Sequence, residues 1–215
     1  SYCVENKIKT IISMGDVLDI RRSLIGLDMW WLVTEFIPLL DKHGITFFVI
    51  QGNHTQILRD DNLICWDKWL ERESIAQGSH CIKAFNTPQD LIIGDTTFAI
   101  LPWVNAKSHD LTVDYINNTD ATIALGHLEL ENFSMGGSLC KHGTLDSKLL
   151  SQFNNTYSGH FHVESRSGSI KYLGTPYDLT WQDASDHTER GLYKFCTLTQ
   201  ELTFIPNKPD QSMFI

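Results

Sequence analysis

The stretch ITFFVIQGNH, residues 45–54, decides the fold class because it combines a buried strand with a polar turn. Residues 45–50 are almost wholly apolar or β-branched, which is typical of a strand buried on both faces of a parallel sheet. Gly52 then allows a sharp turn, and Asn53 and His54 follow at once. An Asn-His pair has no packing role at the end of such a strand. The stretch therefore predicts an α/β protein with polar ligands at a strand end.

The same design recurs at three other strand-like runs: IISMGD (11–16), IALGH (123–127) and TYSGHFH (156–162). Open α/β folds bind ligands just beyond the carboxyl ends of their strands, so we expect these four segments to meet at one edge. The candidate metal ligands are Asp16, Asn53, His127, His160 and His162, with His54 beside them. One such motif alone is more often a plain turn, but four together favour a site.

The chemical types of these side chains indicate the kind of metal. Carboxylate, amide oxygen and imidazole, without thiolate, suit Mn, Fe, Zn or Mg and not a structural zinc cage. Five or six ligands exceed the need of one tetrahedral ion, so we expect two divalent ions, about 3.5–4 Å apart. His160 and His162 stand two residues apart in a segment we expect to be extended, which would point both rings the same way.

The patterns along the chain predict two packed mixed β-sheets flanked by helices. We expect helices over 27–42 (with a kink or stop at Pro38), 62–76, 108–117 and 145–152. We expect strands over 10–14, 45–50, 80–84, 91–93, 96–101, 121–125, 155–158, 161–164, 169–173, 192–197 and 201–205. The sequence has no run of about 20 apolar residues, which is the length that would predict a membrane span.

Bulk composition narrows the functional class. With 215 residues, a single domain over 1–215 is expected, and the net charge of −9 argues against a protein that coats nucleic acid non-specifically. It leaves room for an enzyme whose positive charge is carried by bound metal ions. Five cysteines without CxxC spacing indicate free thiols in a reducing, cytoplasmic setting.

The motifs GDVLDIR, GNH, GH and GHFH, in this order, resemble those of the calcineurin-like metallophosphoesterases. Within that superfamily the chain looks most like the SbcD-type DNA repair and recombination nucleases, especially their T-even-like phage branch. The stretches that carry this likeness are GDVLDIRRSLIGL, FAILPW, GHLELENFSMGGSLCKHG and SGHFHVESRSGSIKYLGTPYDLTWQD. The resemblance implies an αββα sandwich that acts on DNA.

The resemblance also implies residue roles. Asp16 would bridge two ions, preferably Mn²⁺ with Mg²⁺ as the alternative. Asn53, His127 and His160 would complete the ligand set of one ion, and His162 would bind the other. His54 would face the substrate phosphate as general acid or transition-state stabiliser, while a metal-activated water attacks phosphorus in line.

Two departures from the family pattern stand out. The family's Asp-x-His motif is not found upstream of Asp16, so the first-ion site is incomplete as written. We therefore expect an N-terminally truncated chain that lacks its first strand, with the capping and ATPase-binding regions also absent. Thr55 stands where the family usually has an acidic residue after GNH, which predicts a less basic His54 and slower turnover.

Other residues and partners remain open. Asp19 and Arg21 fit a supporting or substrate-contacting role about as well as a loop salt bridge. His142 could reach a substrate phosphate, but an exposed loop histidine is the simpler interpretation. The expected partners are DNA, an SMC-like (SbcC-type) ATPase and a second copy bound through residues 20–42, with no membrane. Two alternatives stay open: a phosphodiesterase or phosphatase acting on small molecules, and a catalytically weak scaffold that binds DNA or the ATPase.

Overall fold

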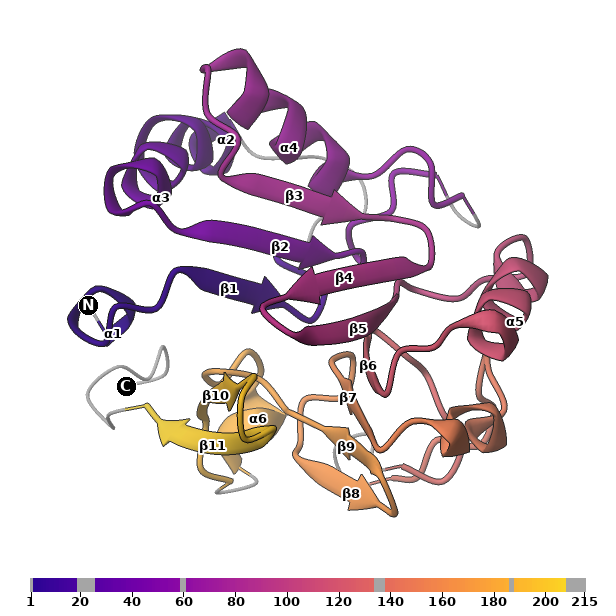
Figure 1. The fold of residues 1–215 in the computed structure, drawn as a ribbon. Coiled ribbons are helices and arrows are strands. Elements are labelled where there is room, and N and C mark those ends of the chain that lie inside the picture. The colour runs from indigo at the N-terminus through magenta and orange to yellow at the C-terminus, as the bar shows by residue number, and fades with distance from the viewer. Residues whose placement is uncertain (1, 19–25, 59–60, 134–137, 186–187, 208–215) are drawn as a thin grey trace.

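The protein is seen here in a computed structural model, which describes residues 2–18, 26–58, 61–133, 138–185 and 188–207 (Figure 1). Its elements build two sheets with helices on their outer faces, as the sequence predicted. Among the described residues, no helix is long and apolar enough to cross a bilayer.

The first sheet is parallel and has the strand order β1-β2-β3. Its strands are β1 (Thr10–Ser13), β2 (Thr46–Ile50) and β3 (Ile82–Phe85). Helical segments cover its outer face in Figure 1: α2 (Gly26–Trp31), η1 (Leu32–Phe36), α3 (Ile37–His43) and α4 (Trp66–Ala76). A short α1 (Tyr2–Glu5) precedes β1.

Pro38 explains why the predicted helix over 27–42 is broken into pieces. A proline inside a helix has no N–H to donate and crowds the preceding turn. The chain responds with a π-helical stretch, η1, immediately before α3, and Ile37 N donates to the Leu32 carbonyl across it. Gly44, at φ 57°, then ends α3 in the left-handed conformation.

The second sheet is mixed, with the order β4-β5-β6-β7-β9-β8. Its strands are β4 (Gln89–Ile93), β5 (Thr96–Leu101), β6 (Ile123–Gly126), β7 (Asn155–Ser158), β8 (Ser165–Ser167) and β9 (Ile170–Tyr172). Its outer side carries α5 (His109–Asn118) and the 3₁₀ helix η2 (Ser147–Gln152). A separate antiparallel hairpin follows α6 (Trp181–Ser185), made of β10 (Gly191–Cys196) and β11 (Glu201–Pro206).

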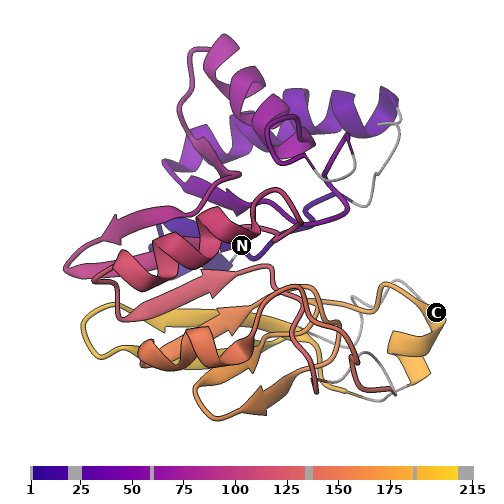
Figure 2. The same ribbon diagram turned by 90° about the vertical axis from the view of Figure 1, so that its right-hand side faces the viewer.

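The layers are joined by a buried cluster between the two sheets. Phe48 and Ile50 from the first sheet pack there against Phe98 and Ile123 from the second. Figure 2 shows the helices α2, α3 and α4 on the side of the first sheet that faces away from the second sheet. The predicted fold class is confirmed, although one of the two sheets is purely parallel and the C-terminal hairpin pairs with neither of them, packing instead through Phe195 and Leu202 against the cluster between them.

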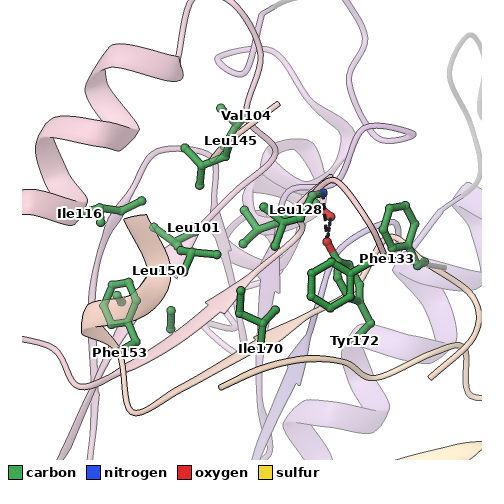
Figure 3. Packing of buried hydrophobic residues seen from close by; sticks show 14 of the residues in the cluster. Leu101, Val104, Ile116, Leu128, Phe133, Leu145, Leu150, Phe153, Ile170 and Tyr172 are labelled. Atoms are coloured by element: carbon green, nitrogen blue, oxygen red, sulfur yellow. Dashed lines mark hydrogen bonds between the residues drawn. The ribbon is translucent and has the colours of Figure 1, made fainter. Parts of the chain in front are cut away.

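A second buried cluster fixes the chain just beyond β6. The Tyr172 hydroxyl donates to the Leu128 carbonyl at 2.9 Å and accepts from Leu130 N at 3.2 Å (Figure 3). Leu128 and Leu130 are fully buried. The backbone that follows His127 is therefore held firmly, which fixes the direction of that histidine.

Most predicted elements are present, and their ends differ by a few residues. The helix expected over 62–76 begins only at Trp66, and the one over 145–152 is a 3₁₀ helix. The strand expected over 161–164 is wrong. His160 has φ 79°, which turns the chain, and the next strand begins at Ser165. Consequently His160 and His162 do not lie side by side on one extended segment.

Candidate metal centre

Four strand ends converge on one small cluster of polar side chains. Ligand atoms of Asp16, His127 and His160 all lie within 4.8 Å of one another. The amide oxygen of Asn53 is 3.1 Å from His127 Nε2. The structure thus brings together four of the five side chains that the sequence suggested as metal ligands.

His127 presents its Nε2 to this cluster because its other nitrogen is occupied. Nδ1 lies 2.8 Å from the Met14 carbonyl oxygen, which can only accept, so Nδ1 carries the hydrogen. Nε2 then faces Asp16 Oδ2 at 3.0 Å and Asn53 Oδ1 at 3.1 Å. The Nε2 lone pair and the two oxygens are all acceptors, so they repel one another unless a proton or a cation lies between them. The arrangement therefore fits a divalent metal, with a proton on Nε2 as its substitute in the metal-free protein.

Asp16 is held in the ionised form that metal binding requires. Its Oδ1 accepts a hydrogen bond from the backbone N–H of His54 at 2.8 Å. Burial alone would raise the pKa of Asp16, but the nearby charge of His127 and these hydrogen bonds outweigh it and leave the pKa below its usual value. The residue adopts φ 50°, an uncommon conformation that aims its carboxylate inward.

Two of the recurring glycines are required by the close approach of these loops. A Cβ on Gly52 would lie 2.0 Å from Asp16 Oδ1, and a Cβ on Gly15 would lie 2.1 Å from His127 Nδ1. Each glycine therefore makes room for a side chain that belongs to another strand end. The glycine-plus-ligand repeat in the sequence has a steric explanation.

His160 is kept neutral, as a metal ligand must be. Burial, and next the positive charge of His127, lower its pKa to about 3. Its ring lies 5.1 Å from the rings of Trp103 and His127, measured between centroids. Glu129 Oε1 lies 3.6 Å from His160 Nε2. Trp103 and Glu129 lie in the stretches FAILPW and GHLELENFSMGGSLCKHG that carry the family resemblance, but the sequence reasoning gave neither of them a role.

His162 lies apart from this cluster, with a different partner. Its Nδ1 is 3.1 Å from Asp183 Oδ2, and its side chain is 40% exposed. Asp183 also escaped the sequence reasoning, although TWQD, residues 180–183, has the Thr-x-x-Asp pattern of a helix start.

The remaining candidates fall outside the cluster or outside the described residues. His54 is partly buried, and its backbone contributes the N–H bound by Asp16. His142 is exposed, and its carbonyl accepts from Cys140 Sγ. Asp19 and Arg21 lie outside the described residues.

Comparison with known proteins adds a sequence relative. No family model matches the chain. Exonuclease subunit 1 of Enterobacteria phage T4 is 30% identical to it over 206 residues, 96% of this chain and 58% of the phage protein. The chain is similar in sequence to part of this phage exonuclease subunit. The resemblance to phage nuclease subunits that the motifs indicated is thereby confirmed, and the chain spans less than two thirds of the relative's length.

A solved structure described as a novel archaeal phosphodiesterase aligns with 96% of this chain and 87% of its own. Its TM-score is 0.44 and its sequence identity 12%, too low to bear on the function of this chain.

Proposed function

We propose that this chain hydrolyses phosphodiester bonds in DNA with the help of divalent metal ions, as the nuclease part of a repair or recombination complex. The observation that carries the proposal is the convergence of Asp16, Asn53, His127 and His160 at one point. The similar phage protein named above is an exonuclease subunit, which supports a nucleic acid as the substrate class.

The proposed ligands would be shared between two metal ions. Asp16, Asn53, His127 and His160 would hold one ion, preferably Mn²⁺, and Asp16 with His162 would contribute to the second. Bound divalent ions polarise a phosphate and lower the pKa of water. Among the described residues, the group of three or more His, Cys, Asp or Glu side chains close enough to share an ion is Asp16, His127 and His160, so the second ion would need ligands in addition to Asp16 and His162.

His54 would act on the substrate and not on the ions. Its backbone N–H already binds Asp16 Oδ1, which fixes the start of its side chain beside the centre. We assign its imidazole the role of general acid towards the leaving oxygen. The protein would act on DNA in the cytoplasm.

The proposed partners include a second copy of the chain. An apolar hollow is lined by Val17, Leu18, Leu27, Trp30, Trp31 and Phe36. Leu27 is 72% exposed and Trp30 56%, an unusual exposure for such large apolar side chains. We propose that this α2 surface pairs with its copy, and that an SMC-like ATPase binds elsewhere on the full-length protein.

The deciding experiment compares substrates on the full-length protein. With Mn²⁺ present, we expect cleavage of linear duplex DNA, and we expect His54→Ala to lower its rate at least 100-fold while leaving Mn²⁺ binding intact. Hydrolysis of bis(p-nitrophenyl) phosphate without any cleavage of DNA would instead support a small-molecule phosphodiesterase. Failure to bind Mn²⁺ would support the scaffold alternative.

A further inference from the structure

We propose that Asp183 is a positioning residue that holds His162 in the tautomer and orientation needed for its Nε2 to bind a divalent cation. The proposal rests on the metal-dependent function above and adds a residue to which the sequence motifs gave no role. Three independent sets of contacts carry it.

The first set is the pairing of the two side chains. His162 Nδ1 lies 3.1 Å from Asp183 Oδ2 and 3.2 Å from Oδ1. A carboxylate accepts, so Nδ1 donates, and the lone pair of the ring is left on Nε2. The side chain of Asp183 is 5% exposed and that of His162 is 40% exposed. One edge of the imidazole ring therefore contacts a buried carboxylate, and the rest of the ring is partly exposed to solvent.

The second set shows that Asp183 is itself fixed. Its Oδ2 accepts from Leu179 N at 3.1 Å and from Thr180 N at 2.9 Å, and the Thr180 hydroxyl accepts from Asp183 N at 3.1 Å. This reciprocal pair is a capping box at the start of α6. A carboxylate that accepts from two backbone N–H groups has little rotational freedom. The imidazole of His162, which is bound to this carboxylate, is restricted as well.

The third set fixes the backbone of His162 from another side. Its carbonyl accepts from Thr175 N at 3.0 Å and from Arg190 Nη1. Arg190 also donates to the Asp183 carbonyl at 3.3 Å, and its Nη2 is 3.8 Å from Asp183 Oδ1. Three segments therefore meet at His162: the turn at 174–175, the start of α6, and Arg190, the residue before β10.

Because Asp183 also caps a helix, the test must separate capping from positioning. Asp183→Asn keeps an acceptor for the backbone N–H groups but places an amide where a carboxylate faced His162. Thr180→Ala is the matched control, since it removes the hydroxyl of the capping box and leaves the contact between Asp183 and His162. Binding of Mn²⁺ to the full-length protein, followed by the EPR signal of the free ion, gives a readout independent of catalysis.

We expect the wild type to bind two equivalents of Mn²⁺. Asp183→Asn should weaken one of them about 10- to 100-fold, and His162→Ala should weaken the same one. Adding Asp183→Asn to His162→Ala should cause no further loss. Thr180→Ala should lower the melting temperature but leave both affinities unchanged.

Two results overturn the proposal while the proposed function survives. One is wild-type affinity in Asp183→Asn, which would leave Asp183 as a helix cap only. The other is wild-type affinity in His162→Ala, which would remove His162 from the ligands. A wild type that binds no Mn²⁺ at all is a separate outcome, since it overturns the proposed function before any variant is measured.

Discussion

The hydroxyl of Thr55 lies 2.5 Å from Oδ2 of Asp67, a carboxylate that is 1% exposed in the first turn of α4. The sequence pattern suggested that the turn after Asn53 and His54 lacks an acidic neighbour, because Thr55 stands there. The fold supplies a carboxylate from twelve residues further along the chain and connects it through the Thr55 hydroxyl. The prediction of slow turnover, which rested on Thr55 alone, stays a prediction that the kinetics of Thr55→Asp can test.

Asp67 should make the stability of the metal-free protein depend on pH. Burial raises its pKa to about 7, and the charge of Asp16 also raises it, although the Thr55 hydrogen bond opposes this. The unfolded chain has the ordinary value of about 3.9, so the folded protein holds an extra proton between about pH 4 and 7. The resulting stability is complete below pH 4 and is lost as pH rises through 7.

Asp67→Asn removes this titration and gives the comparison that isolates it. Urea unfolding in the presence of a chelator should show wild-type stability falling relative to the variant by about 1 kcal/mol per pH unit between pH 5 and 7. The other ionisable groups are common to both proteins and cancel. A difference in stability that does not change with pH would mean that Asp67 is already ionised at pH 5.

Gly52→Ala should damage the centre for steric reasons alone. The new methyl group would lie 2.0 Å from Asp16 Oδ1, so either the carboxylate or the turn must move. We expect a loss of about 1–3 kcal/mol in the free energy of unfolding, together with weaker Mn²⁺ binding. Calorimetry of both quantities checks this.

Gly26→Ala is the control for that substitution, because a Cβ at Gly26 meets nothing within 4 Å. It should leave Mn²⁺ binding unchanged and should not destabilise α2, where alanine favours the helix. Equal effects of the two substitutions would show that the close approach at Gly52 is not what maintains the site.

The sequence was sufficient to predict most of the elements and the meeting of the four strand ends. Long apolar runs such as 45–50 allow few interpretations, and parallel strands necessarily bring their carboxyl ends to one edge. The glycines before Asp16, Asn53, His127 and His160 marked these ends correctly.

The errors arose where a local rule depended on tertiary contacts. The chain after Gly159 was taken as extended, but it turns at His160, whose ring packs beside Trp103. Asp67 and Asp183 were missed because each acts through a partner distant in sequence, Thr55 and His162. Spacing along the chain does not reveal such pairs, since only the folded backbone places them together.

Trp30→Glu should separate the proposed dimer. Trp30 and Trp31 are 56% and 49% exposed in the same hollow, and a charge there would be buried without a partner if two copies met. We expect sedimentation of the full-length wild type as a dimer and of the variant as a monomer at micromolar concentration. Leu198→Glu, on a side chain 85% exposed far along the sequence, is the control and should remain dimeric.

Divalent metal should stabilise the folded protein through the cluster around His127. Any ligand that binds only the native state stabilises it by about 2.7 kcal/mol when its concentration is 100 times the dissociation constant. Addition of Mn²⁺ should therefore raise the melting temperature by several degrees, and a chelator should reverse the change. In His127→Ala, which removes the Nε2 that faces Asp16 and Asn53, the rise should disappear.

His80→Ala serves as the control for His127→Ala, because His80 is exposed and follows α4 outside the cluster. Its melting temperature should respond to Mn²⁺ as the wild type does. If His127→Ala gained as much stability from Mn²⁺ as the wild type, the ion would have to bind elsewhere. The three acceptors at Asp16, Asn53 and His127 would then be satisfied by a proton alone, and the proposed metal centre would have to be abandoned.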